Sequence, residues 1–186
     1  MRNAIKSIEE FQPTCEQEEV DKALFLEVLR TNEKCLTRES LLGHFTVSAW
    51  VMNRAKTHVL CVNHNILGGW RWIGGHCDGD DDFLAVITRE IEEETGLEKF
   101  ELYEEGIFSI QTLCVQAHRK NGKYVPSHVH LDVAYVFVAD EGQQVRIQEE
   151  ENSGVAWKTF EELIAAVPKN YASHTAFRKI VAKIRQ

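Results

Sequence analysis

Residues 74–97 read GGHCDGDDDFLAVITREIEEETGL and are the most informative segment of the chain. A loop rich in glycine and aspartate comes first, and a segment with apolar residues at helical spacing follows it. Gly96 stands where a helix commonly ends. The stretch therefore predicts a loop that leads directly into an amphipathic helix with many carboxylates. The apolar positions of that helix are Phe83, Leu84, Val86, Ile87 and Ile91.

Helical geometry separates the glutamates of this segment. At about 100° per residue, Glu94 lies about 20° from the apolar direction of the helix and Glu90 about 60° from it. Glu92 points away from the apolar direction and is expected to face solvent. Because Glu90, Glu93 and Glu94 stand at positions i, i+3 and i+4, their carboxylates share one helix surface.

Two interpretations of this carboxylate group follow from the residues alone. A run of charges is most often the solvated face of a helix. Like charges aimed at a buried edge repel each other, however, unless a cation compensates them, and oxygen-rich sites suit Mg²⁺ or Mn²⁺. Taken without any relative, the residues leave both interpretations open.

The same stretch resembles the Nudix box, in which Gly, five residues, Glu, seven residues and Arg-Glu-aliphatic-any-Glu-Glu-any-Gly-aliphatic follow one another. Asp81 departs from the pattern, because it stands at the first Glu and is one methylene shorter. The resemblance implies an α/β (α+β) Nudix fold, a mixed β-sheet sandwiched between helices, with a helical N-terminal extension and a C-terminal helix. The positions that match in register are Gly75, Arg89, Glu90, Ile91, Glu93, Glu94, Gly96 and Leu97.

The resemblance also implies a chemistry, the divalent-metal-dependent hydrolysis of a diphosphate bond in a nucleoside diphosphate linked to another moiety. Glu90, Glu93 and Glu94 would bind Mg²⁺ or Mn²⁺, with the Gly74 carbonyl as a further ligand. Metal ions would cancel charge on the phosphates while an activated water attacks phosphorus in line. A general base must take the proton from that water.

The family places this base either in the box or in a later loop. Glu151 is the later candidate, because it precedes Trp157 in a segment that resembles the family's later acidic segment. The alternative base is Glu93, and residues 149–151 also have the composition of an ordinary polar loop. By resemblance, Arg89 is expected to pair with a carboxylate and brace the box loop.

Four residues outside the box are candidates for substrate binding. Strand alternation puts His128, His130 and Asp132 on one face, where they either line the substrate cleft or form a solvated strand. Trp70 could stack on a base, although Trp packs into a core more often. A zinc set in this region is not expected, because the spacing of its candidates fits no usual pattern. Those candidates are Cys61, His64, His76 and Cys77.

Composition narrows the class of partner. The 186 residues carry a formal net charge of −8, so their field repels nucleic-acid polymers and anionic membranes. A small nucleotide-type substrate remains compatible, provided that a cation offsets its charge. The N-terminal residues lack the apolar run of a signal peptide or anchor, and the five cysteines are irregularly spaced, as free thiols are. We therefore expect a cytoplasmic protein.

The remaining segments predict the organisation of the chain. We expect a helical N-terminal extension over 1–43 and a Nudix hydrolase domain over 44–186 that includes the C-terminal helix. Capping boxes at 14–17 and 159–162 predict the start of helices over about 15–31 and 159–167. Further expected elements are two strands within 45–62, a strand at 70–73, extended segments at 101–110 and 113–117, a strand at 129–138 and a helix over 174–185.

Two other functional classes remain. A catalytically weak nucleotide-sensing Nudix module is favoured by Asp81, the one eroded position of the box. An enzyme similar to isoprenyl-diphosphate isomerase, which shares the fold, would use a cysteine such as Cys77, but that family lacks an intact box. A homodimer is possible, since family members are often dimers.

Overall fold

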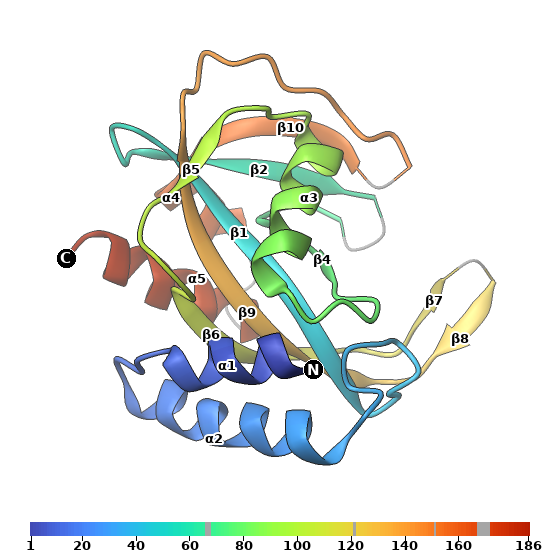
Figure 1. Ribbon diagram of the computed structural model, residues 1–186. Coiled ribbons are helices and arrows are strands. Elements are labelled where there is room, and N and C mark those ends of the chain that lie inside the picture. Colours follow the sequence, from blue (N-terminus) through green and yellow to red (C-terminus); the bar gives the residue numbers. More distant parts are fainter. Residues whose placement is uncertain (66–67, 121, 151, 167–171) are drawn as a thin grey trace.

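The computed structural model describes residues 1–65, 68–120, 122–150, 152–166 and 172–186 (Figure 1). Its helices are α1 (Arg2–Glu10), α2 (Glu16–Thr31), α3 (Phe83–Thr95), α4 (Phe160–Ala166) and α5 (Ala172–Ile184). Its strands are β1 (Gly43–Asn53), β2 (His58–His64), β3 (Trp70–Arg71), β4 (Ile73–His76), β5 (Phe100–Leu102), β6 (Ser109–Val115), β7 (His118–Lys120), β8 (Lys123–Val125), β9 (His128–Ala139) and β10 (Asn152–Thr159).

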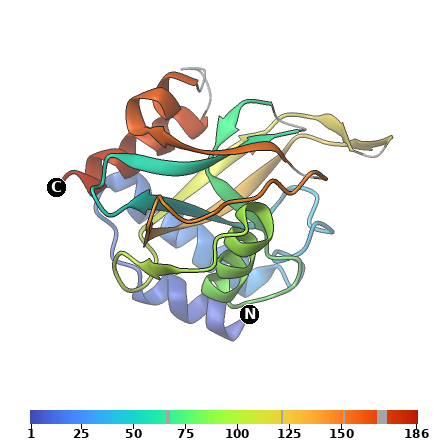
Figure 2. The same ribbon diagram turned by 90° about the horizontal axis from the view of Figure 1, so that it is seen from above.

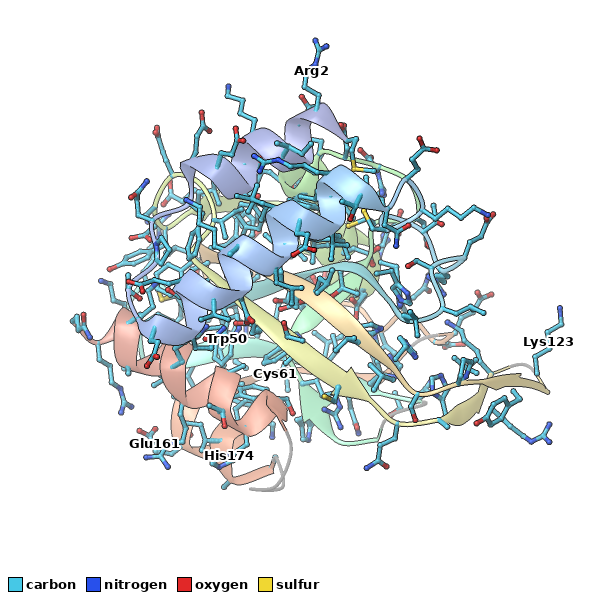
Figure 3. All side chains as sticks on the ribbon, turned by 90° about the horizontal axis from the view of Figure 1, so that it is seen from below. Arg2, Trp50, Cys61, Lys123, Glu161 and His174 are labelled. Carbon is cyan, nitrogen blue, oxygen red and sulfur yellow. The ribbon has the colours of Figure 1, made fainter. Side chains whose placement is uncertain are left out.

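One mixed sheet organises the fold. Its strand order is β10-β2-β1-β9-β5, with β3 paired to β2, β4 to β1 and β6 to β9. β9 runs parallel to β1 along the whole of β1, whereas the other pairs in this sheet are antiparallel. β7 and β8 form a separate hairpin, and Lys123 at its tip projects away from the body of the molecule (Figure 3).

Helices cover both faces of this sheet (Figure 2). Alternating residues of β1 and β9 point to opposite sides, as the pleat requires. Phe45 and Leu131 belong to a core that contains side chains of α1, α2 and α3. Trp50 and Val136 belong to a second core, which contains side chains of α4 and α5. The expected mixed sheet between layers of helix is confirmed.

Several boundaries differ from those expected from the sequence. α1 lies within the expected helical extension over 1–43, although the sequence does not define its bounds, and it buries Ala4 and Ile8 completely in the first core. β10 is not predicted by the sequence. The extended segment expected over 101–110 is wrong in its middle, because β5 ends at Leu102 and β6 begins at Ser109. The expected end of the helix at Val167 lies outside the described residues.

The two expected capping boxes have different outcomes. At α4 the prediction is confirmed, since Glu162 N donates to Thr159 Oγ1 at 3.1 Å and Thr159 N donates to Glu162 Oε2 at 2.8 Å. At α2 the box is displaced by one residue. Cys15 is the N-cap without a side-chain bond, and Thr14 N donates to Glu18 Oε2 at 2.9 Å.

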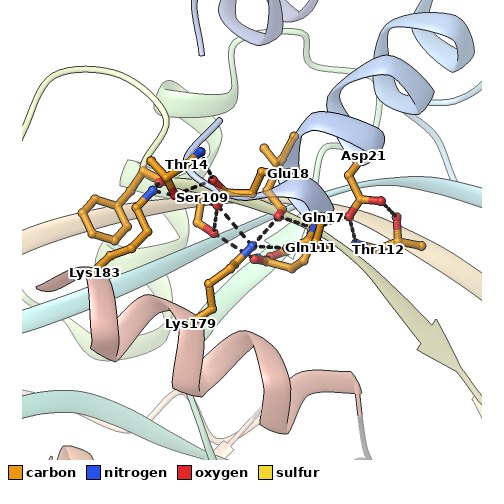
Figure 4. A network of polar contacts seen from close by, with 12 residues as sticks. Thr14, Gln17, Glu18, Asp21, Ser109, Gln111, Thr112, Lys179 and Lys183 are labelled. Carbon is orange, nitrogen blue, oxygen red and sulfur yellow. Dashed lines mark hydrogen bonds and ion pairs between the residues drawn. The ribbon is translucent and has the colours of Figure 1, made fainter. Parts of the chain in front are cut away.

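Glu18 connects the N-terminal helices to the rest of the fold (Figure 4). Its side chain is fully buried, and it accepts a hydrogen bond from Ser109 Oγ of β6 at 2.9 Å. Two ammonium groups of α5 lie beside the same carboxylate, Lys179 at 3.2 Å and Lys183 at 3.8 Å. One carboxylate therefore links α2, β6 and α5.

The charge of Glu18 is maintained by these contacts. Burial raises the pKa of the Glu18 carboxyl, but the Thr14 backbone and the two lysines outweigh it, so the pKa lies below the usual value.

No described helix combines the length and the apolar character that crossing a bilayer requires.

We predict that Glu18→Ala lowers the free energy of unfolding by about 3 kcal/mol at neutral pH, because it removes the negative charge beside the ammonium groups of Lys179 and Lys183. Urea unfolding followed by circular dichroism measures this change, and Glu19→Ala, on the exposed face of the same helix, is the matched control.

The same series has a defined pH dependence. The folded-state pKa of Glu18 is depressed, so its stabilisation is present above the ordinary value of 4.5 and is lost as pH falls through the folded-state pKa. The difference between wild type and Glu18→Ala should shrink below that pH. A difference that stays constant in acid would show that packing, and not charge, accounts for the effect.

Candidate active site

The box loop and α3 are held by local caps at both ends of the helix. Asp82 is the N-cap, and its side chain accepts a hydrogen bond from Ala85 N at 3.1 Å. At the other end Gly96 adopts the left-handed conformation with φ of 67°, as a C-cap glycine can. Arg146 N then donates to the Thr95 carbonyl at 2.7 Å, so the last turn has a partner from a distant loop.

Two glycines of β4 permit close approaches, Gly75 toward α3 and Gly74 toward β1. A Cβ built on Gly75 would collide with the carboxylate of Glu90. A Cβ built on Gly74 would lie 2.5 Å from the Val47 carbonyl oxygen of β1. The absence of side chains at both positions therefore gives room to the Glu90 carboxylate and to the β1 backbone.

The helix directs its glutamates as the helical wheel predicts. Glu94 is only 4% exposed, and its Oε1 accepts a hydrogen bond from Gly74 N at 3.1 Å. Glu90 is half-buried against Gly75, whereas Glu92 is exposed. Glu93, one helical turn after Glu90, is also exposed. Two carboxylates thus lie against β4, and a third is open to solvent.

Arg89 lies on the outer side of α3. Its guanidinium is 3.8 Å from the Asp80 carboxylate of the box loop, with both side chains well exposed. An ion pair with a loop carboxylate was expected there. A role of Arg89 in the reaction stays a prediction.

Asp81, which replaces the first glutamate of the box, contacts α1. Asn3 donates to it twice, from its backbone N at 3.1 Å and from Nδ2 at 2.9 Å. The shorter side chain at this position therefore binds the start of the N-terminal helix.

Glu151, the candidate base of the later loop, lies outside the described residues. The next residue, Asn152, begins β10 and is buried. Its Nδ2 donates to the Glu94 carbonyl at 3.2 Å. The start of β10 is thereby joined to the carboxyl end of α3.

The candidate residues of β9 lie on the face of the sheet opposite α3, as strand alternation predicts. Their neighbours Leu131 and Val133 point into the core that contains α3. Asp132 is 2% exposed and accepts hydrogen bonds from Thr46 Oγ1 at 3.0 Å, Ser48 Oγ at 2.8 Å and Gln111 Nε2. Burial raises the pKa of Asp132 to about 6, although these hydrogen bonds oppose the rise. Asp132 thus joins three strands, and substrate contact by it stays a prediction.

His128 and His130 belong to a group of histidines. His44 of β1 pairs with His130 of β9, and His76 of β4 pairs with Thr46, two residues after His44 in β1. The ring centroids of His44, His76 and His130 lie 5.0–5.1 Å apart. Sequence reasoning missed this group, because strand pairing unites residues that are far apart in the chain.

Trp70 is half-buried beside β10. The ammonium of Lys158 lies 4.6 Å from its ring centroid, and a Cβ on Gly154 would lie 3.1 Å from its ring. These contacts are those of a packed side chain, and base stacking by Trp70 stays a prediction.

The donor set around β4 fits a hard divalent cation. Glu90 and Glu94 lie against Gly75 and Gly74, and Glu93 follows on the same helix. Carboxylate and carbonyl oxygens are the donors that Mg²⁺ and Mn²⁺ prefer. The residues that would bind such an ion are Glu90, Glu93, Glu94 and the Gly74 carbonyl.

Comparisons with known proteins agree with this architecture. A model of the NUDIX domain matches residues 43–179. A binary complex of an Ap4A hydrolase from C. elegans is similar in structure, with a TM-score of 0.56 and 18% identity over 76% of this chain and 97% of that chain. The dihydroneopterin triphosphate pyrophosphohydrolase of E. coli has a TM-score of 0.55 and 11% identity, over 75% of this chain and 95% of that chain.

A third similar structure is the NUDIX domain of Shewanella oneidensis NrtR complexed with ADP ribose. Its TM-score is 0.52, with 18% identity over 86% of this chain and 97% of that chain. At such low identities the likeness shows the fold alone. No curated protein matches the sequence.

The two glycines of β4 give a paired prediction. Gly74→Ala should lower the free energy of unfolding by roughly 1–3 kcal/mol, because the new Cβ meets backbone that cannot move cheaply. Gly75→Ala should cost less, because its Cβ meets the end of the flexible Glu90 side chain.

Thermal or urea unfolding of the two variants beside Gly142→Ala, where a Cβ would approach only the Asp140 side chain at 3.3 Å, measures the difference. Equal losses at positions 74 and 75 would contradict the close approach of β4 to β1.

Proposed function

The chain belongs to the NUDIX domain family, and on that basis we propose that it hydrolyses a diphosphate bond in a nucleoside diphosphate linked to another moiety, with Mg²⁺ or Mn²⁺ as cofactor. The observation that carries the proposal is the pair of α3 carboxylates that lie against β4. Glu94 is buried on the Gly74 amide and Glu90 lies on Gly75. Burying carboxylates is costly, and a cation at this position would offset that cost.

A divalent cation bound to these oxygens supplies charge neutralisation on the phosphates and lowers the pKa of an attacking water. The protein's own residues orient that chemistry. The Gly74 amide fixes the Glu94 carboxylate, and the caps at Asp82 and Gly96 fix the helix that presents it. Preorganised groups of this kind stabilise the charge that develops during the reaction.

The proton of the attacking water needs an acceptor. Glu93 is exposed on the helix that carries Glu90 and Glu94, so its carboxylate is open to a bound substrate. Glu151 is the candidate base of the later loop, with Glu93 as its alternative, and it immediately precedes the residue that binds the Glu94 carbonyl. A carboxylate positioned beside the attacking water is a common general base.

A nucleotide-sensing module is the second candidate function, favoured by the contacts of Asp81. This position of the box is bound by Asn3, at the start of the N-terminal helix. In such a module the same site would bind a nucleotide without hydrolysing it.

Product release from a panel of nucleotides tests the proposal. A dinucleoside tetraphosphate, ADP-ribose and a nucleoside triphosphate would each be incubated with Mg²⁺ or Mn²⁺, and the nucleotide products would be separated by anion-exchange chromatography without a coupling enzyme. Glu94→Gln should lower the rate on the order of 100-fold or more, because it removes a charged ligand from the reacting centre. Glu92→Gln, exposed on the far side of α3, is the matched control and should leave the rate unchanged.

Each outcome decides between the two functions. Release that a chelator abolishes, together with the loss in Glu94→Gln, supports the hydrolase and identifies its substrate class. Absence of release from every compound, with normal circular dichroism, contradicts the hydrolase, and calorimetric binding of one of the same nucleotides would then support the sensor.

The base is identified by a separate pair of variants. We predict that Glu93→Gln or Glu151→Gln, whichever removes the base, lowers kcat by 10²–10⁴-fold, the typical contribution of general base catalysis, and abolishes the acidic limb of the pH–rate profile. The other variant should keep that limb. Retention of the limb in both variants would exclude both residues as the base.

A further inference from the structure

The histidine group lies on the opposite side of β4 from the box carboxylates. Successive residues of a strand point to opposite faces, so Gly75 faces Glu90 and His76 faces away from α3. β4 and β9 flank β1, with Thr46 paired to both His76 and Asp132 and His44 paired to His130. Three adjacent strands therefore each direct imidazole to the same place.

The nitrogens of these rings are close enough to share one ion. One ligand atom each of His44, His76 and His130 lies within 4.8 Å of the others. His128 is a near neighbour, with its ring centroid 5.0 Å from those of His44 and His130 and its Nε2 3.2 Å from His130 Nε2. Zinc–nitrogen bonds of about 2.0–2.1 Å in a tetrahedron place ligand nitrogens about 3.3 Å apart. The remaining contraction is within the reach of side-chain rotation.

Backbone carbonyls orient two of the rings. His44 Nδ1 lies 3.1 Å from the Ser40 carbonyl, and His128 Nδ1 lies 2.8 Å from the Pro126 carbonyl. A carbonyl oxygen only accepts, so each Nδ1 carries the proton. The lone pair of His44 Nε2 is then free, and that of His128 Nε2 points at His130 Nε2. Metal-binding histidines almost always have such an outer partner.

The Nε2 of His44 gives an independent indication of a missing ligand. His44 is 5% exposed, and its buried Nε2 has no hydrogen-bond partner. An unsatisfied buried nitrogen is costly, and most such atoms in native proteins have a partner. A metal ion would satisfy this atom.

We propose that His44, His76 and His130 bind a divalent transition-metal ion of the Zn²⁺ type, with His128 as the fourth ligand. Nitrogen donors distinguish this site from the carboxylates of α3, because imidazole suits Zn²⁺, Cu²⁺ or Ni²⁺ and Mg²⁺ prefers oxygen. The ion would tie β4, β1 and β9 together at the root of the β7–β8 hairpin, where the chain enters β9 (Figure 1). This proposal does not depend on the hydrolase activity.

Equilibrium dialysis against Zn²⁺ tests the site in the full chain. The protein carries no histidine tag and is first stripped with a chelator, and Mg²⁺ in large excess occupies oxygen sites during the titration. Wild type should retain one Zn²⁺ per chain. His76→Gln, whose side chain is only half-buried, should weaken binding by more than the 10–100-fold that loss of an outer partner costs.

Two control variants separate this site from others. His58→Gln changes a histidine at the far end of β2, and Glu94→Gln changes the box, so both should bind Zn²⁺ as wild type does. His44→Gln provides a second loss at a buried ligand, and circular dichroism monitors its fold. Cobalt substituted for zinc in wild type should give the visible absorption of a tetrahedral nitrogen site.

Contrary results are equally defined. The proposal is overturned if wild type binds no more Zn²⁺ than His76→Gln does under these conditions. Loss of Zn²⁺ in Glu94→Gln but not in His76→Gln would also overturn it, because the ion would then belong to the carboxylates.

Discussion

β1 and β9 run parallel and pair through eleven successive residues, from Gly43 with Val129 to Asn53 with Ala139. Parallel strands cannot be joined by a tight turn, so a long crossover must separate them. In this chain that crossover contains the box loop and α3. The pairing therefore fixes where the helix of carboxylates lies on the sheet.

Because side chains alternate along β1 and β9, the pairing places two different sets of residues on the two faces of the sheet. On one face Phe45 and Leu131 build the core under α3. On the other face the sheet changes along its length, from the histidine group through Asp132 and its hydrogen bonds to the core around Trp50. A shift of one residue in register would exchange these faces. The burial of the apolar side chains and the hydrogen bonds of Asp132 therefore require the same register of β1 and β9.

Sequence predicts the parts of this architecture that are local. The box is contiguous, so its helix and the burial order of Glu94 and Glu92 follow from helical spacing, and Gly96 marks the end of the helix. The hairpin of β1 and β2 follows from its composition in the same way. β10 is not predicted, because its residues form a strand only by pairing with β2. Strand formation depends on such tertiary contacts more than on the local sequence.

The histidine group could not be predicted for the same reason. His44, His76 and His130 are separated by long stretches of chain, and no short spacing motif unites them. The usual zinc patterns rely on ligands at neighbouring positions of one turn or helix. His76 directly follows the glycines of the box, whereas its neighbours in space come from β1 and β9. β4 therefore has a different group on each face. Gly75 makes room for the Glu90 carboxylate on the α3 side, and the His76 imidazole lies on the opposite side. The oxygen and nitrogen donors are close in sequence, but the sheet keeps them on opposite faces, so they cannot share one coordination sphere. Because carboxylate oxygen and imidazole nitrogen prefer different metals, each face favours its own ion.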